Sequence, residues 1–250
     1  MGEALVAGLL DAGWGKADDI TVVEPLDARR RDLTARTHGL RVSDAPVPAQ
    51  GVVLAVKPSD VQGACASLRG ADRVLSIAAG VPLVKLEAWL GPDTPVIRAM
   101  PNTPALVGAG AAAISSGSSA TEDDLAWAEE ILSAVGKVVR LPEYLLDAVT
   151  GLSGSGPAYV FLVAEALIEG GVLAGLPRDV SQTLAVQTML GAARLLAESG
   201  DSAETLRAGV TSPGGTTAAG LRVLESKSVR SAFLEAVMAA TERSKELGAG

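Results

Sequence analysis

The first 145 residues alternate short apolar runs with amphipathic segments. The apolar runs have the length and composition of buried strands, and they cover residues 20–24, 51–56, 73–77, 95–100, 111–115 and 137–141. The segments between them carry helix signals, and two of these segments begin with an expected capping box, at Ser59 and at Thr121. Strands separated by helices favour parallel pairing with right-handed crossovers. We therefore expect an α/β domain with a Rossmann-like, doubly wound parallel sheet over residues 1–145.

Beyond residue 145 the strand pattern disappears and helical periodicity remains. Pro157 and Pro177 take first-turn positions of two long helices, expected over residues 157–174 and 178–199. The other expected helices cover residues 202–208, the segment after the turn at 212–217, and residues 229–247. No cluster of polar loop residues separates the two halves. The sequence therefore predicts an all-helical second domain, residues 146–250, joined to the first by an ordered connection.

The chain begins inside a recognisable unit. Residues 1–14, MGEALVAGLLDAGW, are typical of the first helix of a dinucleotide-binding βαβ unit. Gly2 then takes the place of the third glycine of the G-x-G-x-x-G pattern. The first strand and the first two glycines of that pattern would precede Met1. We therefore expect the natural protein to be longer at this end.

Composition and charge narrow the function classes. The chain is 48% hydrophobic but only 3% aromatic, so its core is expected to consist of Ala, Val and Leu. A net charge of −8 argues against a nucleic-acid surface, which needs clustered Lys and Arg, and the only basic run is Arg29-Arg30-Arg31. The single cysteine, Cys65, excludes an internal disulfide and fits a reducing, cytoplasmic compartment. We expect it to be a small apolar core residue.

A membrane span, a metal site and a hydrolase triad are not expected. The apolar stretch 159–176 is interrupted by Glu165 and Glu169, and no other run reaches the roughly 18–20 residues that a span needs. The one histidine, His38, precedes a glycine at an expected helix end, where a capping role is usual. A metal site or a Ser–His–Asp triad would have to use that same histidine.

Three expected loops follow neighbouring strands of the first domain. They consist of Ala55, Val56, Lys57 and Pro58; of Ala78, Ala79 and Gly80; and of Met100, Pro101 and Asn102. In open α/β sheets ligands bind at the carboxyl ends of the strands, where small residues and prolines hold the backbone close to them. Lys57 is suited to a phosphate or hydroxyl, and Asn102 to an amide. The three loops together favour a ligand crevice.

The residues after the first apolar run bear on the cofactor. Glu24 closes that run about 20 residues into the unit, where an acid binds the adenosine ribose hydroxyls of NAD. Arg29 and Arg30 are close enough in sequence to neutralise the 2′-phosphate of NADP. The sequence therefore leaves both NADH and NADPH open.

A turn rich in glycine and hydroxyl groups opens a late helix. It has the sequence Ser212-Pro213-Gly214-Gly215-Thr216-Thr217. The first N–H groups of a helix have no intrahelical partner, and the helix dipole favours an anion beside them. A second glycine- and serine-rich stretch, GLSGSGPAY at 151–159, is expected to be another turn before a helix. Neither stretch holds a charged side chain, so a cofactor would have to supply the reactive group.

These motifs together resemble the pyrroline-5-carboxylate reductase family of proline biosynthesis. The resemblance covers essentially the whole chain. It rests on TSPGGTTAAGLRVLE at 211–225, DAVTGLSGSGPAY at 147–159, AVKP at 55–58 and RAMPNTPALVGAG at 98–110, in this order. The resemblance implies transfer of a hydride from NADPH or NADH to 1-pyrroline-5-carboxylate, which gives L-proline. It also implies a helical dimerisation domain that interlocks with a partner's, an active site at the dimer interface, and assembly into larger rings, commonly decamers.

The resemblance also implies roles for individual residues. The three strand-end loops, with Gly2 and Glu24, would line the cofactor. The substrate would be held by Val210, Ser212, Gly214, Gly215, Thr216 and Thr217, with the Thr217 hydroxyl near the ring nitrogen as the catalytic group. The chain departs from the family in two places. The glycine loop is absent apart from Gly2, and Glu24 replaces the polar or basic residue of many relatives, which bears on the choice of cofactor.

Two other interpretations of the sequence remain open at this point. One is a different Rossmann-type imine or hydroxyacid dehydrogenase, although residues 146–226 contain no lysine of the kind that hydroxyacid enzymes place in the second domain. The other is a non-catalytic nucleotide-binding relative that has kept the fold. The intact substrate turn argues against it, whereas the absent glycine loop argues for it.

Overall fold

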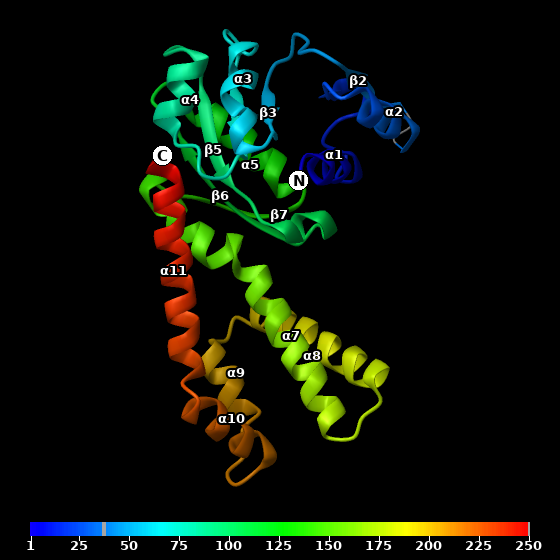
Figure 1. Ribbon diagram of the computed structural model, residues 1–250, viewed down its shortest axis with the longest axis vertical. Helices are drawn as coiled ribbons and strands as arrows, with labels where there is room; N and C mark the ends of the chain where they lie inside the picture. Colours follow the sequence, from blue (N-terminus) through cyan, green and yellow to red (C-terminus); the bar gives the residue numbers. More distant parts are fainter. Residues whose placement is uncertain (37–38, 250) are drawn as a thin grey trace. The chain divides into compact units, whose positions relative to one another are not determined.

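The computed structural model describes residues 1–36 and 39–249, and it packs as two units. The first unit consists of Met1–Ser155 together with Ala239–Gly250, and the second consists of Gly156–Met238. Figure 1 shows the strands β3–β7 in the first unit and the helices α7–α10 in the second. The boundary expected from the sequence between residues 145 and 146 stays a prediction.

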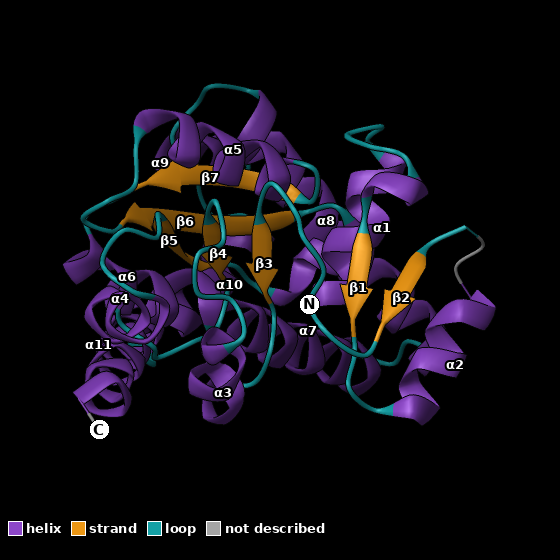
Figure 2. Ribbon diagram, turned by 90° about the horizontal axis from the view of Figure 1, so that it is seen from above, coloured by secondary structure: helices purple, strands orange, loops and turns teal. Residues whose placement is uncertain are grey.

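Each of the six apolar runs forms a strand. The strands are β1 Thr21–Val23, β2 Arg41–Ser43, β3 Val52–Leu54, β4 Val74–Ser76, β5 Val96–Met100, β6 Gly110–Ser116 and β7 Gly136–Arg140. β2 was not expected from the sequence, because it is short and begins and ends with polar residues. It pairs in parallel with β1, whereas β3 to β7 form a five-stranded sheet in chain order (Figure 2).

One pair of strands runs antiparallel. β5 and β6 are joined by the single 3₁₀ turn Thr103–Val107, which is too short for the crossover that a parallel connection requires. The other four strand pairs are parallel. The expectation of parallel pairing is therefore correct for these four pairs. The single parallel sheet is not, because β5 and β6 make the five-stranded sheet mixed and β1 pairs with β2 in a separate sheet.

Helices cover both faces of the five-stranded sheet. α1 (Gly2–Asp11) and α5 (Glu122–Ser133) pack against one face, and α3 (Val61–Ala66) and α4 (Leu83–Leu90) pack against the other. β4 shows the alternation that this requires, because Val74 belongs to the α3/α4 cluster and Leu75 to the α1/α5 cluster. The first unit is therefore doubly wound, as the sequence predicts.

Of the two expected capping boxes, only one forms. The Thr121 hydroxyl accepts a hydrogen bond from the backbone N–H of Asp124, whose carboxylate accepts from the backbone N–H of Thr121 at 2.8 Å. The expected box at Ser59 is wrong. A 3₁₀ turn (Pro58–Asp60) occupies that place, and α3 begins at Val61 without a side-chain cap. Pro58 suits the first position of this 3₁₀ turn, which starts one residue before the expected cap.

The remaining helices lie mostly in the second half of the chain. They are α2 Asp27–Arg36, α6 Leu146–Val149, α7 Gly156–Leu173, α8 Arg178–Glu198, α9 Ala203–Gly209, α10 Thr216–Ser226 and α11 Val229–Ala249. A π-helix, Thr150–Gly154, lies between α6 and α7. No strand follows residue 150 within the described part of the chain. The all-helical character expected for this region is confirmed.

The second unit has almost no core of its own. α7 buries no residue, and α8 buries only Ser181 and Ala185. Exposed apolar side chains instead cover both helices: Val160, Phe161, Leu162, Leu167, Leu173, Leu184, Val186, Leu190 and Leu195. Such faces need a covering surface, since soluble monomers rarely expose apolar patches of this extent.

The apolar stretch is longer than the sequence suggests. Among the described residues, one helical run, Glu143–Leu173, is long and apolar enough to cross a membrane by length and composition. This run overlaps the apolar stretch 159–176, which Glu165 and Glu169 interrupt. It starts earlier than expected because GLSGSG continues the helix instead of interrupting it.

Candidate functional site

The three expected ligand loops lie along one edge of the sheet. β3, β4 and β5 are parallel neighbours, and their register aligns Leu54 with Ser76 and Ser76 with Arg98. The loops that begin at Ala55, at Ala78 and after Met100 therefore leave the sheet on the same side. This is the edge at which doubly wound folds bind their ligands.

The start of α1 lies beside the first of these loops. A Cβ atom added to Gly2 would lie 3.3 Å from the Cβ of Ala55, so a larger residue at position 2 would press the helix away from β3. No side chain caps this helix, and its first N–H groups have no intrahelical partner. The arrangement fits the close backbone approach that a dinucleotide phosphate needs at a helix N-terminus.

Glu24 directly follows β1, in the separate two-stranded sheet, and an ion-pair cluster connects it to the start of α1. Its carboxylate pairs with Arg29 at 3.3 Å, and Arg29 also reaches Glu3 in the first turn of α1 at 3.2 Å. The cluster joins the end of β1 to the start of α1. The structure thus brings Gly2, Glu24 and the Ala55 loop together, although they are far apart in sequence.

The two polar loop residues differ in their contacts. Lys57 is exposed beside Pro58, so its ammonium group is accessible. Asn102 is buried, and both ends of its amide are engaged, with Nδ2 donating to the Ser153 carbonyl at 3.0 Å and Oδ1 accepting from the Ala111 N–H at 2.8 Å. Asn102 therefore ties the β5 loop to the π-helix. Its expected contact with a cofactor amide stays a prediction.

The Met100 side chain packs against the same π-helix. A Cβ atom on Gly154 would lie 2.6 Å from Met100 Cε, so only a glycine at position 154 leaves enough space for this side chain. Gly80, in the middle loop, has a positive φ of 73°, which disfavours a side chain there. Both glycines affect the backbone and packing at this edge of the sheet, but neither has a side chain that could contact a ligand.

The 212–217 turn leads into α10 through a positive-φ glycine and an N-cap glycine. Gly214 has a positive φ of 70°, and the Gly215 N–H donates to the Ser212 carbonyl at 3.0 Å. Gly215 is the N-cap of α10, and no side chain caps this helix. The N–H groups of Thr216 and Thr217 are therefore left for a ligand.

The side chains of this turn are accessible. Val210, Ser212, Thr216 and Thr217 are all exposed. A Cβ atom on Gly215 would lie 2.5 Å from the Ser212 hydroxyl, so this hydroxyl lies directly against the N-cap residue. Thr217 stands at the second position of α10 and makes no cap hydrogen bond. Its hydroxyl can therefore both donate and accept toward a bound molecule.

The second expected turn, GLSGSG at 151–156, does not exist. These residues form the π-helix and the start of α7, and the Ser155 N–H donates to the Thr150 carbonyl at 2.8 Å. The Thr150 and Ser153 hydroxyls bond back to the carbonyls of Leu146 and Val149. Their polar groups are thus engaged inside the helix. The turn at 212–217 remains the hydroxyl-rich candidate for an anion.

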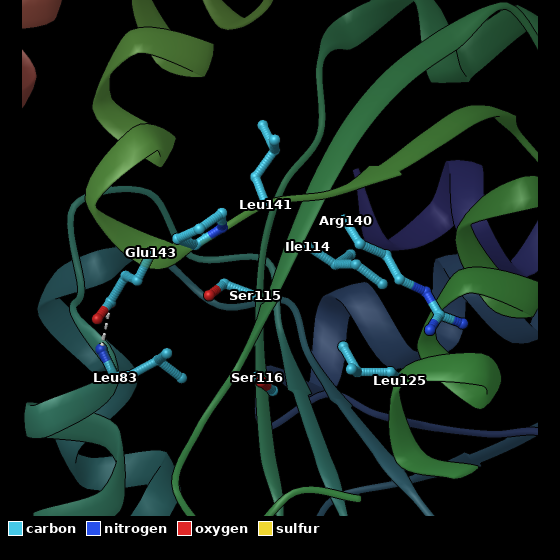
Figure 3. A pocket seen from close by; sticks show the side chains of 9 residues that line it. Leu83, Ile114, Ser115, Ser116, Leu125, Arg140, Leu141 and Glu143 are labelled. Carbon is cyan, nitrogen blue, oxygen red and sulfur yellow. Dashed lines mark hydrogen bonds between the residues drawn. The ribbon is translucent and has the colours of Figure 1, made fainter. Parts of the chain in front are cut away.

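A hollow of about 480 Å³ lies elsewhere on the first unit, and it includes none of the expected site residues (Figure 3). Glu143 stands at its rim and accepts hydrogen bonds from the Leu83 N–H at 2.6 Å and from Arg98 at 2.8 Å. The side chain of Arg98 is only 11% exposed. The sequence analysis missed this partly buried ion pair, because no local pattern links residues so far apart.

The other titratable candidates are structural. Cys65 is fully buried in α3, and burial raises the pKa of its thiol, so it is a neutral core residue as expected. His38 lies outside the described residues. Within the described ranges, no group of three or more His, Cys, Asp or Glu side chains is placed to hold a metal ion.

Comparison with known proteins gives consistent matches. A family profile described as pyrroline-5-carboxylate reductase dimerisation matches residues 143–247. The pyrroline-5-carboxylate reductase of Synechocystis is 51% identical, over 99% of this chain and 95% of that protein. The structure of a pyrroline-5-carboxylate reductase from Coxiella burnetii has a TM-score of 0.93 at 38% identity, covering 98% of this chain and 94% of that one. A Plasmodium falciparum pyrroline carboxylate reductase with NADP bound has a TM-score of 0.86 at 31% identity, covering 99% and 94%.

Proposed function

Because this chain belongs to the pyrroline-5-carboxylate reductase family, we propose that its 212–217 turn holds 1-pyrroline-5-carboxylate and that its strand-end loops hold NAD(P)H. The protein is an NAD(P)H-dependent oxidoreductase that reduces 1-pyrroline-5-carboxylate to L-proline. The observation that carries this activity is 51% identity over 99% of the chain with a reductase of that name.

The first unit supplies the cofactor contacts. Gly2 and the start of α1 suit the pyrophosphate, Glu24 suits the adenosine ribose, and the loops after β3, β4 and β5 line the rest of the edge. When bound, NAD(P)H supplies the hydride that forms a C–H bond at the imine carbon. Lys57, exposed beside Pro58, is a candidate for a cofactor phosphate.

The 212–217 turn supplies the substrate contacts. The carboxylate of the substrate is an anion, and the unpartnered N–H groups at the start of α10 are donors that the helix dipole makes more positive. Thr217 bonds to the ring nitrogen, which carries a proton in the electrophilic iminium form and becomes the amine of proline. The reaction moves the C=N electron pair to nitrogen, so a hydroxyl that both donates and accepts suits both forms.

The helical region is the dimerisation domain. The exposed apolar faces of α7 and α8 fit an interface with a second copy, and the matching family profile is described as a dimerisation region. We expect a homodimer that assembles further, in the ring of five dimers that the family resemblance implies. Coverage by a second copy also accounts for the apolar run Glu143–Leu173 without a membrane. The single cysteine and this apolar interface fit a cytoplasmic enzyme.

Removal of the substrate carboxylate tests the role of the turn. We expect 1-pyrroline, the same cyclic imine without the carboxylate, to have a kcat/KM about 100-fold or more below that of 1-pyrroline-5-carboxylate, because charge-assisted hydrogen bonds contribute roughly 1.5–3 kcal/mol each. Steady-state rates of coenzyme oxidation measure both values. Equal kcat/KM values would show that the turn does not bind the substrate carboxylate.

A further inference from the structure

The Glu24 carboxylate is held in a fixed orientation at the end of β1. The backbone N–H of Glu24 donates to the Ser43 carbonyl at 2.9 Å, and Oε1 accepts from the Leu26 N–H at 3.0 Å. Oε2 faces Arg29, and the side chain is only 19% exposed. A carboxylate has about four acceptor positions, so some remain after these two contacts. Glu24 can therefore accept hydrogen bonds from vicinal hydroxyl groups.

The neighbouring arginines already have partners. Arg29 lies between the Glu24 and Glu3 carboxylates, at 3.3 and 3.2 Å. Arg30 donates to the backbone carbonyls of Glu24 and Pro25 at 3.0 and 2.7 Å, and it also contacts Asp27. These hydrogen bonds and ion pairs fix the conformation of the loop after β1. A guanidinium that turned toward a phosphate would have to break one of these contacts first.

A hollow of about 430 Å³ beside this loop is lined by Arg30 and Arg31, together with Asp27. It would be the alternative place for a phosphate. However, Asp27 pairs with both arginines, at 3.2 and 2.8 Å, so an anion there would meet its carboxylate. The carboxylates of Glu3, Glu24 and Asp27 balance the charges of the three arginines. The loop therefore carries no excess of positive charge.

From these contacts we propose that the chain prefers NADH to NADPH, with Glu24 as the residue that sets the preference; this rests on the proposed function. The Glu24 carboxylate accepts hydrogen bonds from the ribose hydroxyls at the adenosine end. A 2′-phosphate would replace one of these hydroxyl donors with negative charge facing a carboxylate, and such repulsive elements set specificity. The preference for NADH is expected to be about 10- to 100-fold in Kd.

Equilibrium binding tests the proposal independently of turnover. Calorimetric titration of the full-length chain with NADH and NADPH, and with AMP and adenosine 2′,5′-bisphosphate, gives the cost of the 2′-phosphate directly. The Glu24→Gln variant keeps the shape but removes the charge, so the NADH preference should fall by about tenfold. The matched control Glu129→Gln removes a carboxylate that also pairs with an arginine, Arg140, in the same unit. It should leave the preference unchanged.

The outcomes separate this proposal from the proposed function. Tighter binding of NADPH by the wild-type chain, or an equal loss of preference in Glu24→Gln and Glu129→Gln, would overturn the role of Glu24. Failure to bind either coenzyme would overturn both proposals. A chain that binds NADH preferentially but does not reduce 1-pyrroline-5-carboxylate would leave the Glu24 preference standing and contradict the proposed function alone.

Discussion

The Leu162→Asp substitution is expected to weaken self-association by about 100-fold or more and to lower the thermal midpoint. Leu162 is 66% exposed in the single chain and lies on α7, which buries none of its residues. If a second copy covers this face, the new carboxylate is removed from water without a partner, which is strongly unfavourable. Light scattering across a dilution series measures the loss.

A matched substitution separates the interface from a general effect of charge. Val84 is 69% exposed on α4, outside the 143–247 region that matches the dimerisation profile. Val84→Asp should therefore leave the oligomeric state unchanged. The interface itself is expected to bury about 2,000 Å² or more, as obligate dimers do. A wild-type chain that is monomeric at micromolar concentration would contradict this account of the helical domain.

The Thr217→Val substitution is expected to lower kcat/KM roughly 5- to 150-fold, because it keeps the shape of the side chain but removes one hydrogen bond to the ring nitrogen, worth about 1–3 kcal/mol. The affinity for NAD(P)H should barely change, since the nucleotide loops belong to the other unit. Turnover, coenzyme affinity and the thermal midpoint should be measured on the same protein.

The alternative role for Thr217 is a structural one. A capping threonine would cost about 1 kcal/mol of stability with turnover preserved. The structure argues against this, because Gly215 is the N-cap of α10 and no side chain caps the helix. Thr183→Val on α8 is a suitable control, as its hydroxyl donates to the Asp179 carbonyl within its own helix. A lowered midpoint with unchanged turnover in Thr217→Val would leave the residue structural.

Periodicity predicts the first unit well, because its central strands β4 and β5 are largely buried and most of its strands appear as continuous apolar runs. β2 is an exception, since Arg41 and Ser43 give it no apolar pattern. The antiparallel direction of β6 follows from the short connection through Thr103–Val107. The gap between the apolar runs 95–100 and 111–115 already shows this length, but the expectation of a parallel sheet did not take it into account. The π-helix is missed for another reason: glycine and serine normally mark turns, but here backbone bonding continues through them.

The candidate site is partly predictable for a similar reason. Strand ends and helix starts are local features, so the three loops and the 212–217 turn can be located from sequence. Contacts that join distant segments cannot, and these include the Glu3–Arg29–Glu24 cluster and the Arg98–Glu143 pair. The engagement of Asn102 with Ser153 and Ala111 belongs to the same class, because only the fold brings these residues together.

The central claim is tested most directly by supplying 1-pyrroline-5-carboxylate to the purified full-length protein with NADH or with NADPH, while both coenzyme oxidation and L-proline are measured. The account predicts one L-proline formed for each coenzyme oxidised, and faster turnover with NADH at low coenzyme concentration. Coenzyme oxidation without L-proline, or no oxidation with either coenzyme, would contradict it.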